Sequence, residues 1–249
     1  MATAFRHIEP EPGLGFELEL DHDHPCFGCA ARKISLCGIL DSDELRDYRR
    51  TGSNVRLGVG EPLFFEGDPA DAVFTVTTGA LRLSKLLADG RRQIAGFLYP
   101  GDFLGLTVED VHLFTAEAVV PSELCRFSRP RFERFLDAHP HMERKLFAVA
   151  AHELAAARLQ VVLLGRKTAT EKVVSFLLSL ASRCRKHGRL ADTVELPMTR
   201  TDIADYLGLR IETVSRELSA LKAKQMIRLT GMHSLQLLNK PALEALAEG

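Results

Sequence analysis

Apolar side chains recur every three or four positions between residues 141 and 164, which is the period of one face of an α-helix. This a/d spacing is typical of two helices that pack side by side, but a single helix packed on its own domain produces it too. Two and a half heptads do not distinguish these arrangements, because three or four heptads are needed. We interpret the stripe as a candidate dimerisation seam made of Phe147, Ala150, Leu154, Ala157, Val161 and Leu164.

A different pattern precedes this helix. From residue 55 to residue 127 the chain consists of short β-prone runs separated by glycines. Residues 88–91, Ala-Asp-Gly-Arg, have the composition of a hairpin turn. Many short strands with regular turns are typical of a small antiparallel sandwich or roll. Ser128 then offers an N-cap for a helix with Pro130 in its first turn, and Pro140 ends that helix.

The flanking segments complete the division of the chain. Residues 1–40 contain prolines and glycines that discourage long elements, whereas Asp41 and Thr168 each begin a sequence typical of a capped helix start. We therefore predict an α+β protein with an N-terminal antiparallel β-roll, a long helix and a C-terminal helix-turn-helix. The predicted parts are a cysteine-bearing arm (1–40), the roll (41–127), the dimerisation helices (128–165) and a DNA-binding domain (166–249), with a hinge at residues 165–167.

Composition narrows the class of protein. The 249 residues carry a formal net charge of -1, and 46% of them are hydrophobic, an ordinary globular mixture that excludes wholesale disorder. DNA binding would therefore depend on a local basic cluster. No apolar run approaches the ~20 residues of a membrane helix, and the acidic N-terminus lacks the pattern of a signal peptide. We expect a cytoplasmic protein with no membrane partner, in which cysteines stay reduced.

Residues 199–221 have the pattern of a helix-turn-helix. Thr199 and Asp202 form a capping box, and Gly208 marks a tight turn between two short helices. The second helix carries apolar residues at spacings of 3, 4 and 3, which predicts an inward stripe. The alternative is a plain helical hairpin with a solvated polar face. The inward stripe would consist of Ile211, Val214, Leu218 and Leu221, and a two-stranded wing would follow at residues 227–229 and 235–237.

The opposite face of the second helix is polar and suited to base reading. Arginine can make a bidentate contact with guanine O6 and N7, and glutamate can accept a hydrogen bond from cytosine N4. Basic residues next to this face suit phosphate contacts. The polar face holds Glu212, Ser215, Arg216 and Ser219, and the basic edge holds Lys222, Lys224 and Arg228.

Three of the five cysteines, Cys26, Cys29 and Cys37, lie within twelve residues on an irregular segment, and Cys125 at the end of a predicted strand could be a fourth ligand. Four thiolates suit either tetrahedral zinc or an iron–sulfur cluster, and the spacing does not decide between them. His22 and His24 lie nearby, but an Asp-His-Asp-His run is more often a solvated surface. Cys184 has basic neighbours that favour its thiolate, and we interpret it as a plain helix-end cysteine.

Residues 199–216 resemble the winged helix-turn-helix of the CRP/FNR superfamily, and the Glu-x-x-Ser-Arg pattern resembles its FNR branch. The resemblance extends over nearly the whole chain, with the roll similar to a cyclic-nucleotide-binding domain. It implies a homodimer that reads a TTGAT-type half-site in double-stranded DNA, with RNA polymerase as a further partner. Arg210 stands where many relatives carry a small hydroxyl residue. The DNA-binding residues implied are Arg210, Glu212, Thr213, Ser215, Arg216 and Lys222.

The resemblance also implies a cofactor. FNR-branch proteins hold an oxygen-labile 4Fe-4S cluster on three N-terminal cysteines and one in the roll, which correspond here to Cys26, Cys29, Cys37 and Cys125. The seven-residue gap before the third cysteine is similar to that of the FnrL/FnrN group. Leu36 matches a position that in relatives helps to shield the cluster from oxygen.

Two other functions fit less well. A regulator of the same fold could sense a cyclic nucleotide in the roll, but Gly101-Asp102 and Phe114-Thr115 stand at the phosphate-binding places without the required arginine. The same fold could also carry a structural zinc in place of the cluster. An enzyme, such as a metal oxygenase built on the roll, would need clustered ligands, and the roll contains only His112. We therefore expect no enzymatic activity.

Overall fold

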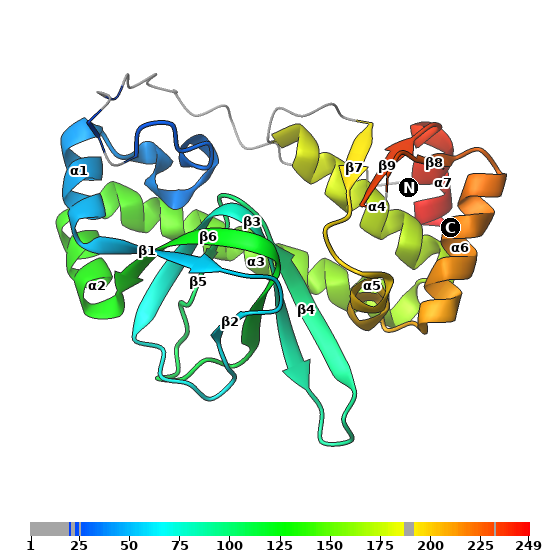
Figure 1. Cartoon of the computed structure of the whole chain (residues 1–249), viewed down its shortest axis with the longest axis horizontal. Helices are drawn as coiled ribbons and strands as arrows, with labels where there is room; N and C mark the ends of the chain where they lie inside the picture. The colour runs from blue at the N-terminus through cyan, green and yellow to red at the C-terminus, as the bar shows by residue number, and fades with distance from the viewer. Residues whose placement is uncertain (1–19, 21–22, 25, 187–191, 232) are drawn as a thin grey trace, which may run out of the picture.

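The computed structural model describes residues 20, 23–24, 26–186, 192–231 and 233–249. Figure 1 shows a sheet-rich part and a helix-rich part side by side, with one long helix passing behind both. The first part is a six-stranded antiparallel sheet in the order β1-β6-β3-β4, with β2 paired to β6 and β5 paired to β3. Its strands are β1 (Gly52–Leu57), β2 (Pro62–Phe64), β3 (Ala72–Leu86), β4 (Arg92–Leu98), β5 (Phe103–Leu104) and β6 (Thr115–Ser128).

The hairpin between β3 and β4 forms as its composition predicts. Gly90 has a φ of 85°, which favours glycine, and the Leu87 amide donates to the carbonyl of Arg91 across the turn. The roll predicted for residues 55–127 is thus antiparallel, as expected.

Helices flank the roll on both sides in the sequence. Two short 3-10 helices, η1 (Arg32–Ile34) and η2 (Leu36–Ile39), lead into α1 (Ser42–Arg50). Asp41 caps α1 as predicted, through a capping box with Glu44. After β6 come α2 (Arg129–Ala138) and α3 (Pro140–Arg166). Ser128 is the N-cap residue of α2, but its side chain makes no capping hydrogen bond, so that detail of the prediction is wrong. Gly165 lies inside α3, and the turn comes at Lys167.

The C-terminal part begins with α4 (Ala169–Lys186), whose capping pair Thr168 and Glu171 forms as predicted. The wing differs from the prediction: it is a three-stranded sheet in the order β7-β9-β8, because β7 pairs with β9 along a register that no local pattern reveals. The remaining elements are β7 (Thr193–Glu195), α5 (Arg200–Leu207), α6 (Ile211–Ala223), β8 (Ile227–Leu229), β9 (Ser234–Leu237) and α7 (Lys240–Glu248).

The roll and the C-terminal part share an apolar core and an ionic contact. Ile94 and Phe97 of β4 belong to the same buried cluster as α4 and α6. Asp202 on α5 is buried and accepts hydrogen bonds from Arg82 at 3.0 Å and from Arg92 at 2.8 Å, both from the roll. Since Asp202 also caps α5, its carboxylate bonds both to the start of the helix-turn-helix and to the roll.

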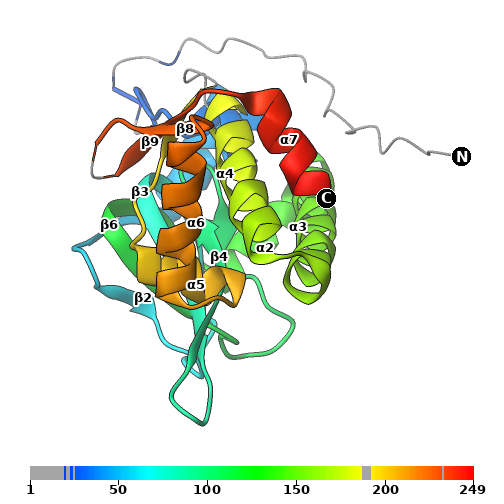
Figure 2. The ribbon, with the colours of Figure 1, turned by 90° about the vertical axis from the view of Figure 1, so that its right-hand side faces the viewer.

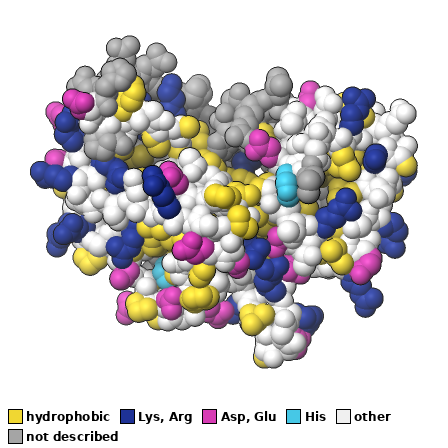
Figure 3. All heavy atoms as spheres, viewed as in Figure 1, with side chains coloured by type: hydrophobic (Ala, Val, Ile, Leu, Met, Phe, Trp, Pro, Cys, Tyr) yellow, Lys and Arg dark blue, Asp and Glu magenta, His cyan; other side chains and the backbone are white. Residues whose placement is uncertain are grey.

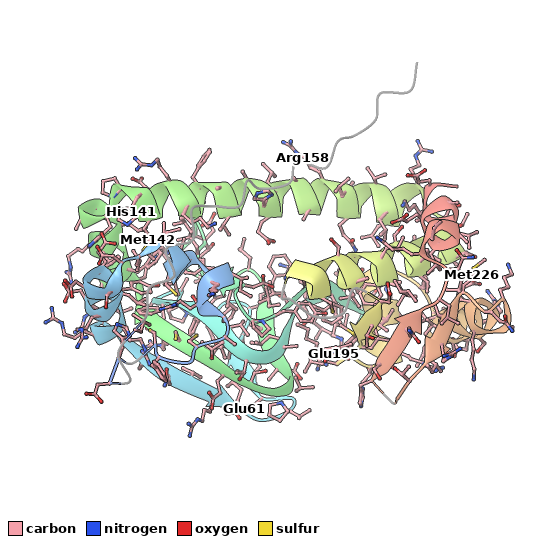
Figure 4. All side chains as sticks on the ribbon, turned by 90° about the horizontal axis from the view of Figure 1, so that it is seen from above. Glu61, His141, Met142, Arg158, Glu195 and Met226 are labelled. Carbon is pink, nitrogen blue, oxygen red and sulfur yellow. The ribbon has the colours of Figure 1, made fainter. Side chains whose placement is uncertain are left out.

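Helix α3 runs along the outside of the molecule, where Figure 4 shows Arg158 pointing away from both parts. It is long and apolar enough to cross a membrane by length and composition, with a mean hydropathy of 1.5 in its best window, none of which is buried. The sequence was expected to contain no apolar segment long enough to cross a membrane, and α3 contradicts this expectation. The many alanines of α3 raise its mean hydropathy without forming an unbroken apolar run. Glu153 and Arg158 lie in its middle, where a bilayer would make them costly.

Candidate nucleic-acid interface and cysteine cavity

The helix-turn-helix is built by two local devices. The Thr199 side chain accepts from the Asp202 amide, and the Asp202 side chain accepts from the Thr199 amide, so the capping box starts α5 as predicted. Gly208 ends α5 in the left-handed region with a φ of 60°, which turns the chain into α6 without steric cost. The stripe of α6 is buried at Val214, Leu218 and Leu221, but Ile211 is 41% exposed because it lies at the first residue of the helix.

The outward face of α6 is polar and accessible. Glu212, Arg216 and Ser219 are exposed, and Ser215 is half-buried because Arg200 of α5 donates a hydrogen bond to its hydroxyl at 3.3 Å. The Arg216 guanidinium lies 3.6 Å from the carboxylate of the adjacent Glu217. This ion pair orients the arginine side chain, which stays exposed. The remaining predicted contacts also lie at this end of the molecule: Arg210, Lys222, Lys224 and Arg228 are exposed, and Thr213 is half-buried.

The figures agree with this placement. Figure 2 looks onto α6 from the end of the molecule, with the β8–β9 hairpin above it and α5 below it. In Figure 3, Lys and Arg side chains gather along the right-hand edge, over the end that carries α6. A protruding helix with an exposed arginine and a basic surround is suited to the major groove of DNA.

The four predicted ligand cysteines line a single cavity between the N-terminal segment and the roll. Cys26, Cys29 and Cys37 come from the segment before α1, and Cys125 comes from β6. Residues that were not predicted to take part also line it, from the 3-10 helices, α1 and β3. They include Arg32, Ser35, Tyr48, Arg49, Thr75 and Thr77.

The loop around the cysteines has a defined local structure. The Cys29 amide donates to the carbonyl of Cys26 at 3.2 Å, and the Ser35 hydroxyl lies 3.0 Å from the sulfur of Cys37. His24 is 3% exposed, and its Nδ1 accepts from the Cys26 amide at 3.0 Å, so the expectation of a solvated histidine was wrong for this residue. His22 lies outside the described residues.

Burial favours the thiol forms of Cys26, Cys37 and Cys125. It raises the pKa of Cys26 to about 12 and that of Cys37 to about 11, and it raises the pKa of Cys125 as well. The negative charge of neighbouring thiolates adds to each of these rises in pKa. Arg49 acts in the opposite direction on the pKa of Cys26 and of Cys125, and the Ser35 hydroxyl lowers the pKa of Cys37. Thiolates here would therefore need a bound cation.

Zinc and a four-iron cluster place different demands on four thiolate ligands. Among the described residues, no three Cys, His, Asp or Glu side chains lie close enough together to share one metal ion. A tetrahedral zinc with Zn–S bonds of about 2.3 Å would need sulfurs about 3.8 Å apart. In a four-iron cluster each thiolate binds a different iron, so its four ligands need not approach a single metal ion. Four thiols lining one cavity are a donor set that such a cluster can use.

The other sequence candidates lie apart from this cavity. Cys184 is on α4 and lines a separate pocket between the roll and α4, together with Tyr99 and Arg183. His112 is a core histidine, stacked on Phe64 at 3.5 Å between ring centroids.

The roll positions compared with a phosphate site already have partners within the chain. The Asp102 carboxylate accepts from the Tyr99 amide at 2.9 Å and pairs with Arg183. The Thr115 hydroxyl accepts from the Glu66 amide at 3.1 Å.

Most of the predicted seam of α3 faces outward. Phe147, Leu154 and Val161 are among the exposed large apolar side chains of the described residues. Ala150 and Ala157 are exposed as well, and Leu164 is half-buried. Only Met142 of α3 is buried, within the apolar cluster that also contains Leu36 and Leu40.

Comparison with known proteins identifies both parts of the chain. Residues 171–246 match the Crp-like helix-turn-helix domain, and residues 54–139 match the cyclic nucleotide-binding domain. The nitrogen fixation regulation protein FixK of Bradyrhizobium diazoefficiens is 44% identical over 225 residues, covering 90% of this chain and 94% of that protein. The transcriptional activator protein FnrL of Cereibacter sphaeroides is 37% identical over 212 residues, covering 84% and 86%. The solved structure of FixK2 from Bradyrhizobium japonicum is similar with a TM-score of 0.73 and 39% identity, covering 78% of this chain and 96% of that chain.

Proposed function

The chain belongs to the CRP/FNR family of DNA-binding transcription regulators, and we propose that it responds to oxygen through a 4Fe-4S cluster held by Cys26, Cys29, Cys37 and Cys125. In this proposal the chain binds a TTGAT-type palindrome as a homodimer in the cytoplasm and acts on RNA polymerase. The cluster, when bound, supplies an oxygen-labile centre. The observation that carries the proposal is the convergence of these four thiols on one cavity.

The cavity is connected to the dimerisation helix by direct packing. The 3-10 helix η2, which contains Cys37, contacts α3. Met142 of α3 is buried in the same apolar cluster as Leu36 and Leu40, against which Cys26, Cys37 and Cys125 pack. Ligation of the cysteines would order the segment before α1 and thereby stabilise the position of α3. Loss of the ligated state would release that segment and weaken the dimer.

The exposed seam and the palindromic site that we propose both support a dimer. A single helix with Phe147, Leu154 and Val161 exposed has an apolar face that a second copy of α3 can cover. Two copies related by a two-fold axis present two α6 helices to the two half-sites of a palindrome. In this proposal Arg216, which is exposed on α6, reads a base, and the exposed Lys222 contacts phosphate.

The proposal is tested by iron content and colour. Protein purified without oxygen should be brown and contain about four irons per chain. Serine at Cys26, Cys29, Cys37 or Cys125 should abolish the colour, whereas Cys184→Ser, which lies outside the cavity, is the matched control and should remain brown. Colourless wild-type protein with one zinc per chain would refute the cluster and leave a structural metal. Colour that survives Cys125→Ser would refute the ligand assignment.

A further inference from the structure

Tyr48 presents a buried hydroxyl group that has no hydrogen-bond partner in the part of the chain that is described. The residue is 3% exposed, and it lines the cysteine cavity from α1. A hydroxyl group buried without a partner is unfavourable, so native proteins rarely retain one without a use for it. The position of this hydroxyl therefore needs an explanation.

Packing holds the Tyr48 ring in place. It stacks on Phe127 with ring centroids 4.1 Å apart and an interplanar angle of 24°. Phe135 lies 5.0 Å away and Phe132 lies 6.4 Å away, both in tilted or edge contacts. Because rings on several sides fix the phenol, the hydroxyl cannot swing out to water and must find its partner inside the cavity.

Sulfur atoms are acceptors in the same cavity. The thiols of Cys26, Cys37 and Cys125 line it together with Tyr48. Arg49 lines it as well, but its guanidinium has only donors and cannot accept a hydrogen bond. Neutral thiols are weak acceptors, whereas thiolates and inorganic sulfides are stronger ones.

We propose that the Tyr48 hydroxyl donates a hydrogen bond to a sulfur of the ligated cluster, either a cysteine thiolate or a sulfide, and so raises the reduction potential of the cluster. This inference rests on the proposed function. A donor directed at sulfur stabilises the more negative, reduced state more than the oxidised state, which is how outer-shell hydrogen bonds tune iron–sulfur centres. Tyr48 is a positioning residue and not a ligand.

The test compares Tyr48→Phe with Tyr99→Phe. Tyr99 is a matched control, because its hydroxyl is also buried without a partner but lies in the separate pocket beside Arg183. Both variants should remain brown with the iron content of the wild type. Tyr48→Phe should shift the ratio of reduced to oxidised cluster at a fixed potential by about tenfold, a negative shift of about 59 mV in a one-electron titration. Tyr99→Phe should leave the potential unchanged.

Two further measurements separate this role from a structural one. In iron-free protein, Tyr48→Phe should unfold at the same or a higher denaturant concentration than the wild type, because the lost hydroxyl had no partner there. In iron-loaded wild-type protein, transfer to D₂O should shift the Fe–S stretching bands, and Tyr48→Phe should reduce that shift.

Three outcomes would overturn either the role of Tyr48 or the proposed cluster itself. Brown Tyr48→Phe protein with the wild-type potential would overturn the role of Tyr48 and leave the cluster proposal standing. If Tyr48→Phe does not fold, the absence of any D₂O-sensitive Fe–S band in the wild type would overturn it instead. Colourless wild-type protein would overturn the proposed function itself.

Discussion

Replacing Leu154 by alanine is expected to weaken the homodimer, because this side chain lies in the middle of the exposed seam of α3. Leu154 is 54% exposed in the single chain. It is flanked along the helix by Ala150 and Ala157, which contribute little apolar surface of their own. The large side chains Phe147, Leu154 and Val161 therefore carry most of the area that a second copy would cover.

The size of the effect follows from this exposure. The substitution removes three carbons, each of which contributes about 0.8 kcal/mol when fully buried. Scaling by the exposed half of the side chain and counting both copies across the two-fold axis gives roughly 2 to 3 kcal/mol. A loss of this size corresponds to a roughly 30- to 150-fold increase in the dimer Kd.

Sedimentation velocity over a range of concentrations, without oxygen and with iron-loaded protein, measures this change. Leu159→Ala is the matched control. Leu159 is 70% exposed, but it lies about half a helical turn away from the seam, so its variant should dimerise like the wild type. Equal weakening by both substitutions, or weakening by Leu159→Ala alone, would show that the seam lies on another face of α3. Circular dichroism should show the same helix content in both variants.

Three other outcomes are expected. Ala157→Leu should enlarge the seam and give dimers in air without a cluster, and a folded monomer in air would contradict this. Arg216→Ala should reduce the binding free energy that discriminates one base pair by about 1–3 kcal/mol, and an unchanged sequence preference would refute the assignment of α6 as the recognition helix. Lys222→Ala should weaken binding to all DNA sequences alike and lower the salt dependence of binding. Asp202→Ala should lower the free energy of unfolding by about 1.5–3 kcal/mol, because it removes the buried carboxylate that accepts from Arg82 and Arg92, although Arg82 keeps Glu117 and Arg92 keeps Asp205. Asp205→Ala, which removes only the partly exposed pairing with Arg92, should cost about 1 kcal/mol or less in the same denaturation experiment.

Features that depend on a few neighbouring residues could be predicted from the sequence. The capping box at Thr199, the glycine turn at Gly208 and the stripe of α6 are set by contacts within one or two helical turns. All three form in the structure, except that Ile211 of the stripe is exposed. The Glu-x-x-Ser-Arg pattern identified the family for the same reason, since a recognition helix keeps its functional residues on one face within a few positions. The hairpin at residues 88–91 is another local feature of this kind.

Only the tertiary structure decided which distant residues meet. Asp202 was predicted as a cap, but its partners Arg82 and Arg92 lie 120 and 110 positions earlier in the chain. Tyr48 gave no local sign of its burial beside the cysteines, because the rings and sulfurs around it come from α2, β6 and the N-terminal segment. The burial of His24 was likewise not predicted from the sequence. Caps and helical periodicity depend on neighbours in the sequence, whereas burial and ion pairing depend on the packing of whole elements, which no short pattern contains.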